Sequence, residues 1–392
     1  MTVGGRPLRV LHVLEALEGG TSRHVVDLVR WTPGVEQHVA IPARRVGGVT
    51  DELAAPALRG HGAEVHTVAM TRSPATVANA RSLTGLVRLV RSLRPDVVHA
   101  HSSIGGLLGR LAGAAGRVPT VYTPNGVTDV RAGVLVEQVL RPATRRLVAV
   151  SSSEAERVRR LRLVGTDRVR VVPNGIDLTR TPEPHDLRGA LGVPPGVPLV
   201  GTISRLVPQK DPLTWVAMAD RVGSEIADAH FAVIGDGALR AEVDAAVAGA
   251  GLADRLHVVP HLPEADRALP SLDVFVMSSV FEGAPYAPME AMWAGVPVVL
   301  TDVAGSADLV TDGVEGRIVP PRDPAALAAA VLDVLRDPVA ARRRADVAAG
   351  AVADRFGGNE MGRRMAAVYA EVVGAAARPR RRRRCESDRR SG

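Results

Sequence analysis

Lys210 and Arg205 together could bind an anion. Lys210 is the only lysine among the 49 lysine and arginine side chains of the chain. It follows Arg205 by five residues, in a loop between an apolar run at 198–203 and a predicted helix at 212–222. A compact ammonium and a planar guanidinium at the end of a strand can grip a diphosphate. The alternative is that both side chains belong to a solvated loop.

Two glutamates in the same half of the chain could bind hydroxyl groups. Residues 281–297 read FEGAPYAPMEAMWAGVP and contain Glu282 and Glu290. Glu282 follows a predicted strand, and Glu290 falls in the first turn of the next helix if Pro288 takes the first helical position. Carboxylates accept hydrogen bonds from hydroxyls, and the free amides of a helix start favour an anion. These groups predict a sugar-nucleotide site. Alternatively, Glu290 only favours the helix dipole and Glu282 is an exposed loop residue.

Paired carboxylates also occur in glycoside hydrolases, where they act as acid and nucleophile across one bond. A hydrolase has no evident use for Arg205 and Lys210. Transfer from a glycosyl diphosphate, in contrast, requires that the charge of the leaving group be neutralised. We therefore favour transfer over hydrolysis.

The first half of the chain offers glycines and histidines after predicted strands. Gly19 and Gly20 precede a predicted helix at 23–31, where a phosphate could approach the backbone, although the pair also suits a simple tight turn. His99 and His101 share one face of a strand because of its two-residue period. The neighbouring sequence offers no further metal ligand, so we expect no metal here. We expect a hydrogen-bonding role in the cleft, by preference for His101.

The order of elements predicts an α/β fold with two domains. A chain of 392 residues exceeds the size of a single core. Short strands alternate with helices, including one at 74–94 and one starting at 50–53, which indicates parallel sheets covered by helices. In such sheets, ligands bind outside the carboxyl ends of the strands. The predicted strands are 9–14, 37–41, 64–68, 96–100, 120–123, 147–150 and 169–172, then 199–203, 230–234, 256–259, 274–277, 296–300 and 317–319.

Charge and hydropathy indicate which binding partners and which cellular location to expect. The net charge of +7 comes mainly from the tail at 377–392, which lacks hydrophobic periodicity and is predicted to be disordered. We expect a solubilising tail without a specific nucleic-acid partner; salt-sensitive contact with anionic lipid stays open. A strand pattern at the N-terminus and no apolar run of membrane-spanning length predict a cytoplasmic protein, with peripheral contact at the inner face of the plasma membrane as an option. Cys385 alone cannot form an internal disulfide.

The glutamate pair in 281–297, together with Arg205 and Lys210, resembles the signature of retaining GT-B glycosyltransferases of glycosyltransferase family 4. Similar family motifs run through most of the chain, and only the tail from about 378 lies outside them. They are found at 19–20, 99–112, 148–154, 173–177, 201–210, 235–237 and 312–313.

The resemblance implies a GT-B fold, in which two Rossmann-like parallel-sheet domains face each other across a cleft. The expected domains are an N-terminal acceptor domain at 1–182 and a donor-nucleotide domain at 198–357. A proline-rich linker at 183–197 joins them. A helix at 358–376 is expected to cross back onto the first domain.

The resemblance also assigns roles to residues. Arg205 and Lys210 would bind the donor diphosphate, Glu290 the ribose hydroxyls and Glu282 the transferred sugar. Further donor contacts are expected at Gly19, Gly20, Gly283, Ala284 and Tyr286. With the cleft role already expected for His101, the predicted catalytic residues are His101, Glu282, Arg205 and Lys210. Family members need no metal or cofactor and no enzyme base, because the departing phosphate takes the proton of the acceptor.

Two positions depart from the family pattern. Residues 122–126 read YTPNG, so Asn125 stands where the family often has a histidine in the cleft. Its amide can still hydrogen-bond a hydroxyl of the donor sugar or acceptor, but it cannot titrate. Asp308 stands where a glutamate is usual, and we expect it to be structural.

The sequence therefore predicts a metal-independent glycosyltransferase that transfers a sugar from a nucleoside-diphosphate sugar to an acceptor hydroxyl with retention of configuration. A UDP-linked sugar is favoured, and a GDP-linked sugar is the alternative. The acceptor would be a small molecule, a glycan or a lipid-linked sugar, in cell-surface glycan, glycolipid or secondary-metabolite biosynthesis. A sugar-nucleotide epimerase on the same scaffold and a non-catalytic binding protein are the alternatives.

Overall fold

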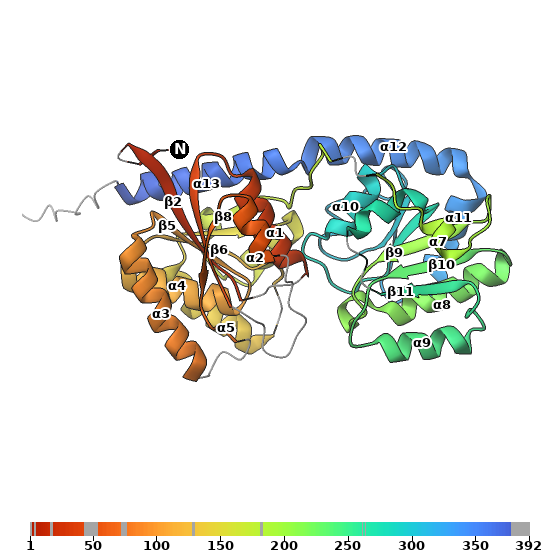
Figure 1. The fold of residues 1–392 in the computed structure, drawn as a ribbon, viewed down its shortest axis with the longest axis horizontal. Helices are drawn as coiled ribbons and strands as arrows, with labels where there is room; N and C mark the ends of the chain where they lie inside the picture. Colours follow the sequence, from red (N-terminus) through yellow and green to blue (C-terminus); the bar gives the residue numbers. More distant parts are fainter. Residues whose placement is uncertain are drawn as a thin grey trace, which may run out of the picture.

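The structure, a computed structural model, has two α/β domains side by side (Figure 1). Two consecutive long helices at the end of the chain run along them, the first over the second domain and the last over the first domain. The structure describes residues 2–3, 5–15, 19–42, 54–71, 77–127, 130–180, 183–260, 262 and 264–377. The tail and the predicted helix start at 50–53 lie outside these residues. None of the described helices has the length and apolar character needed to cross a bilayer.

The first domain is built on an eight-stranded sheet with the order β4-β3-β2-β5-β6-β7-β8, and β1 pairs with β2 at its side. All pairs are parallel except β1 with β2. Its strands are β1 Thr2–Val3, β2 Arg6–Val13, β3 Val35–Ile41, β4 Glu64–Thr67, β5 Val97–His101, β6 Thr120–Thr123, β7 Arg146–Ala149 and β8 Val169–Val171. Its helices are α1 Gly19–Trp31, α2 Ala54–Gly60, α3 Val77–Leu93, α4 Ile104–Gly116, α5 Arg131–Val139, α6 Ser152–Arg160, and the short 3₁₀ turns η1 Arg141–Ala143 and η2 Thr166–Arg168.

The second domain repeats this plan with six parallel strands in the order β11-β10-β9-β12-β13-β14. Its strands are β9 Leu199–Ile203, β10 His230–Ile234, β11 Leu256–Val259, β12 Val274–Met277, β13 Val298–Thr301 and β14 Arg317–Val319. Its helices are α7 Leu187–Leu191, α8 Pro212–Glu225, α9 Arg240–Gly249, α10 Tyr286–Trp293, α11 Pro324–Arg336 and α12 Pro338–Arg355, with η3 Pro208–Lys210 and η4 Ala265–Ser271. The final helix is α13 Gly358–Ala377.

Each sheet is buried on both faces, which explains its runs of Val, Leu and Ile without alternation. In the first domain, Leu11 and Val98 pack against α3 and α4, whereas Val10 and Val97 pack against α1 and α13. In the second domain, one face packs against α8 and α11 and the other against α10 and α12.

In each sheet, the strands are added first on one side of a central strand, β2 or β9, and then on its other side. This reversal of the strand order lies between β2 and β5 in the first domain and between β9 and β12 in the second. Parallel sheets of this kind bind ligands at the carboxyl ends of the strands that flank the reversal. The fold therefore selects the loops after β2, β5, β9 and β12 for inspection.

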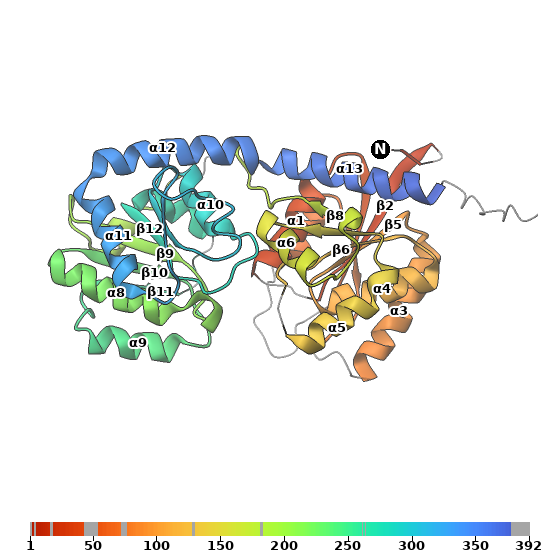
Figure 2. The same ribbon diagram turned by 180° about the vertical axis from the view of Figure 1, so that it is seen from behind.

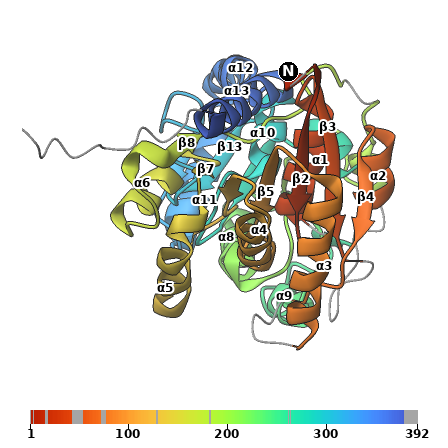
Figure 3. The ribbon, with the colours of Figure 1, turned by 90° about the vertical axis from the view of Figure 1, so that its left-hand side faces the viewer.

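The chain passes between the domains twice, and the two passages are hydrogen-bonded to each other. The amide of Ile176 donates to Phe356 O at 2.8 Å, and the amide of Gly358 donates to Ile176 O at 2.8 Å. A Cβ at Gly175 would lie 2.8 Å from Gly357 O, so only glycine allows this approach. Beyond this point α13 lies along the first domain, as the end-on and rear views show (Figures 2 and 3). The crossing back of the last helix is thus confirmed.

The structure differs from the sequence predictions in several details. Residues 183–197, predicted as a linker, contain α7, and Leu187 and Val193 are buried in a core of the second domain. The domain boundaries stay a prediction. Helix α1 begins at Gly19 rather than at 23, and the short strand β1 was not predicted.

Glu371 fastens α13 to the first sheet. Its carboxylate accepts from Arg146 Nη2 at 2.7 Å and from Arg170 Nη2 at 2.5 Å. The hydrogen bond from Arg146, and to a smaller extent that from Arg170, lowers the pKa of Glu371 from 4.5 to about 2. A carboxyl group whose pKa is depressed in the folded state stabilises the fold above its unfolded pKa and loses this effect as the pH falls.

We therefore expect Glu371→Gln to be less stable than the wild type at pH 7, with a difference that shrinks as the pH falls from 4.5 toward 2. Urea unfolding across this pH range measures the difference. Glu225→Gln is the control, because Glu225 pairs with Arg336 at an exposed position. A stability difference for Glu371→Gln that does not change with pH would contradict the account.

Candidate active site

Lys210 and Glu282 form an ion pair at the carboxyl ends of β9 and β12. Lys210 ends η3, and its Nζ lies 2.5 Å from Glu282 Oε1. Ser279 Oγ donates to the same oxygen at 2.6 Å. The side chain of Glu282 is only 6% exposed, so it is held in one position by its two partners. The cation and the acid that the sequence analysis selected are therefore in direct contact.

Hydrogen bonds tie η3 to the loop that carries Glu282. Gln209 Nε2 donates to Phe281 O at 2.9 Å, and the amide of Val280 donates to Gln209 O at 2.9 Å. Ser278 Oγ lies 2.9 Å from Lys210 O. The sequence analysis missed these supporting residues, because Ser and Gln in loops carry no spacing signal.

Arg205 lies at the interface between the two domains. Its side chain is exposed and has no ion-pair partner among the described residues. A Cβ at Gly19 would lie 3.8 Å from Arg205 Nε, so the start of α1 faces this guanidinium. Arg205 is thus a cation available to a ligand.

Glu290 lies in the second turn of α10, because this helix begins at Tyr286. The expectation that it begins at Pro288 and holds Glu290 in its first turn is wrong. Glu290 Oε1 contacts Arg23 Nη1 of α1 at 2.6 Å. The Arg23 guanidinium lies 4.3 Å from the centre of the Tyr286 ring, and a Cβ at Gly20 would lie 3.9 Å from the same ring. Helix α1 therefore contacts α10 directly.

A second bridge between the domains reaches the loop after Glu282. Asn174 Nδ2 donates to Ala284 O at 2.9 Å, and Asn174 Oδ1 lies 2.8 Å from His24 Nδ1 on α1. Asn174 is buried, with 5% exposure. One amide thereby joins α1 to the loop that carries Gly283 and Ala284.

Asn125 and Gly283 face each other across the domain interface. A Cβ at Gly283 would lie 3.7 Å from the carbonyl carbon of Asn125. Asn125 adopts a positive φ of 56°, which asparagine tolerates better than most residues. The buried carboxylate of Glu154 accepts from Gly126 N at 2.6 Å and so fixes this loop. Burial raises the pKa of Glu154 to about 7.

Asp308 also makes a contact between the domains. Its Oδ2 accepts from the amide of Ser153, in the first turn of α6, at 2.9 Å. A carboxylate is favourable at a helix N-terminus. The position is consistent with the structural role expected for it.

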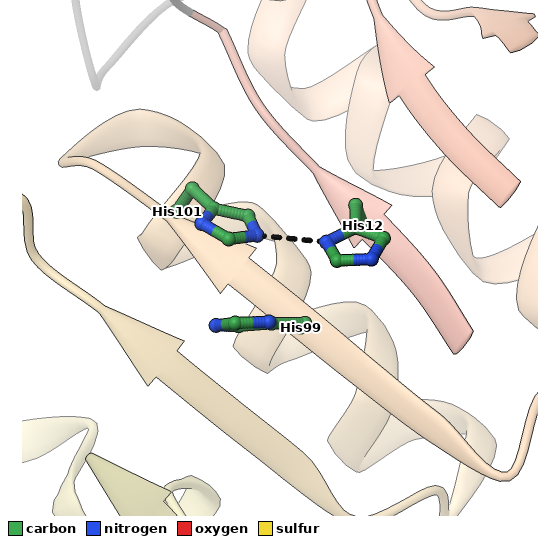
Figure 4. Close-up of side chains that lie close together, drawn as sticks. All are labelled: His12, His99 and His101. Carbon is green, nitrogen blue, oxygen red and sulfur yellow. Dashed lines mark hydrogen bonds between the residues drawn. The ribbon is translucent and has the colours of Figure 1, made fainter. Parts of the chain in front are cut away.

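His101 belongs to a buried row of histidines that does not reach solvent. Figure 4 shows His12, His99 and His101, with His12 Nδ1 3.0 Å from His101 Nε2. Both nitrogens of His99 are engaged, by Tyr369 Oη at 2.8 Å and by Thr123 Oγ1 at 2.8 Å. Burial lowers the pKa of His12 to about 4 and lowers those of His99 and His101. His101 is fully buried among these side chains, and its catalytic role stays a prediction.

The sequence analysis found no third ligand near His99 and His101, yet the fold brings His12 to them. The parallel register of β2 with β5 pairs His12 with His99. This pairing connects residues far apart in the chain, so local sequence could not have revealed it.

Two cations and two carboxylates thus lie after β9, after β12 and on α10, where the second Rossmann-like domain meets the first. Residues 197–337 match the family model described as "Glycosyl transferases group 1", and residues 18–180 match that of "Glycosyltransferase Family 4". The 2-deoxystreptamine N-acetyl-D-glucosaminyltransferase of Streptomyces fradiae is 38% identical over 301 residues, 70% of this chain and 70% of that protein. The chain belongs to glycosyltransferase family 4.

Other relatives agree with this membership. The 2-deoxystreptamine glucosyltransferase of Streptomyces kanamyceticus is 33% identical over 75% of this chain and 82% of that protein. The D-inositol 3-phosphate glycosyltransferase of Xylanimonas cellulosilytica is 33% identical over 71% of this chain and 72% of that protein.

A solved structure confirms the GT-B fold of this family member. Anabaena HepE in complex with UDP and glucose matches with a TM-score of 0.82 and 19% identity, over 93% of this chain and 100% of that chain. Together with the relatives, this establishes a nucleotide-sugar-dependent glycosyltransferase. Neither the epimerase nor the binding-protein alternative is favoured.

The Asn174 bridge leads to a prediction about the glycosyltransferase. Asn174→Ala leaves Ala284 O and His24 Nδ1 without their present partner, and we expect a loss of about 1–3 kcal/mol in the free energy of unfolding. The loop after Glu282 also loses its anchor, so the KM for the donor should rise. Denaturant unfolding and steady-state kinetics measure the two effects. Ser224→Ala, which removes an exposed hydrogen bond to Asp220 O, is the control. Equal stability of both variants would contradict the bridge.

Proposed function

We propose that this glycosyltransferase uses a UDP-linked sugar and retains the configuration of the transferred sugar. The observation that carries the proposal is the Lys210–Glu282 pair, together with Arg205, which has no ion-pair partner among the described residues, at the strand-order reversal of the second domain. Support for UDP comes from Anabaena HepE, whose structures contain UDP with glucose and UDP-glucose. Retention is consistent with the family.

The proposed roles follow from charge and position. Arg205 and Lys210 neutralise the diphosphate as the bond to the sugar breaks. Glu282 binds the hydroxyls of the transferred sugar, and Glu290 those of the ribose. The start of α1 at Gly19 and Gly20 covers the diphosphate from the first domain. Gly283, Ala284 and Tyr286 line the donor next to Glu282, and Asn125 reaches the donor sugar or the acceptor.

The proposed chemistry needs no metal and no base from the protein. The acceptor hydroxyl attacks the anomeric carbon on the face from which the diphosphate departs. The departing phosphate oxygen takes the hydroxyl proton, so one carbon–oxygen bond replaces another on the same face. The cations stabilise the charge that develops on the leaving group.

For the acceptor, we propose a cyclitol or a similar small polyhydroxylated ring. The relatives from Streptomyces fradiae and Streptomyces kanamyceticus are named for 2-deoxystreptamine and the one from Xylanimonas for D-inositol 3-phosphate, which are all cyclitols. A lipid-linked sugar is the second candidate, since an Escherichia coli relative, 29% identical, is named for transfer to a diphosphoundecaprenol-linked sugar. Contact of the tail with anionic membrane and the cytoplasmic location stay predictions.

A panel of nucleotide sugars tests the donor. UDP-sugars should raise the melting temperature of the protein more than GDP-sugars do, because a ligand that binds only the native state stabilises it. The stabilising donor is then incubated with 2-deoxystreptamine or D-inositol 3-phosphate, and NMR reads the configuration of the product. Stabilisation by GDP-sugars alone would contradict the UDP assignment. Isomerised sugar formed without an acceptor would support the epimerase instead.

A further inference from the structure

Two histidines and a glutamate meet at the edge of the first sheet. We call His38, Glu64 and His66 the edge site. His38 lies on β3, and Glu64 and His66 lie on β4, the outermost strand. The parallel register pairs His38 with Glu64, and His66 follows two residues later on the same face. Figure 3 shows β4 beside α2 at the margin of the first domain. None of these residues belongs to the proposed donor site.

The donor atoms of the edge site have the spacing of a metal's ligands. His38 Nδ1 lies 3.1 Å from His66 Nε2 and 3.4 Å from Glu64 Oε2. His66 Nε2 lies 3.7 Å from Glu64 Oε1. A tetrahedral zinc ion about 2.0–2.1 Å from each ligand atom requires ligand atoms about 3.3 Å apart. The separation of the two histidine nitrogens and that of His38 Nδ1 from Glu64 Oε2 lie close to this value, and the third distance ends on the other oxygen of the same carboxylate.

The second ring nitrogen of His38 contacts a carboxylate, as is usual for histidines that bind metals. Its Nε2 lies 3.0 Å from Glu36 Oε1, and Arg9 donates to both oxygens of Glu36 at 2.8 and 3.1 Å. A carboxylate that accepts the second N–H of a histidine fixes its tautomer and orientation. With its proton on Nε2, His38 presents the lone pair of Nδ1 toward His66 and Glu64.

Charge and access favour the edge site over the buried row of His12, His99 and His101. The row offers imidazoles alone in a fully buried place, so the charge of a divalent ion would stay uncompensated. In the edge site, His38 is 4% exposed, His66 19% and Glu64 66%. The carboxylate balances part of the charge, and the exposed side leaves a coordination position for water.

We propose that His38, His66 and Glu64 bind one divalent transition-metal ion, with zinc as the probe. Imidazole and carboxylate ligands in this number suit zinc rather than magnesium or calcium. The ion would join the edge strand β4 to β3 and so stabilise the first domain. It takes no part in sugar transfer.

The test titrates zinc chloride into the full-length protein without an affinity tag, by calorimetry and thermal unfolding. We expect one zinc ion per chain at the edge site and a rise in melting temperature. His66→Gln removes a ligand and should abolish both effects. Glu36→Gln keeps the ligands but removes the support of His38, and should weaken zinc binding about 10–100-fold.

The second domain supplies a matched control. His230 Nδ1 lies 3.3 Å from His257 Nε2 across β10 and β11, but no carboxylate completes a ligand group there among the described residues. His257→Gln should therefore leave the zinc effects of the wild type unchanged. Zinc binding that survives in His66→Gln, or is lost in His257→Gln, would overturn the proposal. Sugar transfer should be the same in His66→Gln and the wild type, so this test is independent of the proposed function.

Discussion

Lys210→Met should lower kcat/KM for sugar transfer by about 10²–10³-fold, the loss seen when one group that stabilises developing negative charge is removed. Methionine keeps much of the length of the lysine side chain but removes the ammonium. Of the two cations proposed to bind the diphosphate, only Arg205 then remains. Initial rates with a UDP-sugar and saturating acceptor measure the effect.

The same substitution also leaves Glu282 buried and without its cation. Breaking a buried ion pair in this way costs about 3–5 kcal/mol of stability, so the melting temperature must be measured with the rates. The double variant Lys210→Met/Glu282→Gln removes the uncompensated charge, and it should recover stability without recovering transfer. Arg336→Met is the control, because Arg336 is 61% exposed and pairs with Glu225 at the surface of the same domain. Wild-type turnover in a folded Lys210→Met protein would contradict the assigned role.

Glu282→Ala should abolish most of the transfer while it leaves UDP bound at least as tightly as in the wild type. The carboxylate is proposed to hold the sugar and not the diphosphate. Its removal frees Lys210 from the 2.5 Å contact, so the ammonium can turn fully to the diphosphate. Calorimetry with UDP and steady-state kinetics with the UDP-sugar separate the two effects.

The contrast between the two variants is the informative outcome. Lys210→Met should lose UDP affinity and turnover together, whereas Glu282→Ala should lose turnover alone. If Glu282→Ala weakens UDP as much as Lys210→Met does, the two side chains act as one unit on the diphosphate. The separate role for Glu282 would then be wrong.

Local sequence patterns were sufficient to predict most of the sheet strands. Short apolar runs between helical stretches predicted all strands of the two sheets except β1, whose two residues are too few to show a pattern. The start of α10 was placed two residues late, because Pro288 suits a first helical position but Tyr286 precedes it in the helix. The predicted linker at 183–197 was rich in proline, yet its few apolar residues, Leu187 and Val193, are buried in the second domain.

The candidate site was predictable where its residues are close in sequence. The same connection after β9 carries Arg205 and Lys210. The loop after β12 carries Glu282, and the helix that follows it carries Glu290. The contacts that join the domains were not predictable in this way. Arg23 with Glu290, and Asn174 between His24 and Ala284, connect segments that only the packing of two complete domains brings together. The same holds for the histidine row and for the edge site, both of which depend on strand register.

Titration of UDP into the wild type and into Lys210→Met tests the central claim most directly, namely that the site after β9 and β12 binds the diphosphate of the donor. The account predicts one UDP per chain in the wild type and a Kd about 10–100-fold higher in Lys210→Met, as expected for the loss of a hydrogen bond to a charged group. Equal UDP affinity in the two proteins, or no uptake of UDP by the wild type, would contradict it.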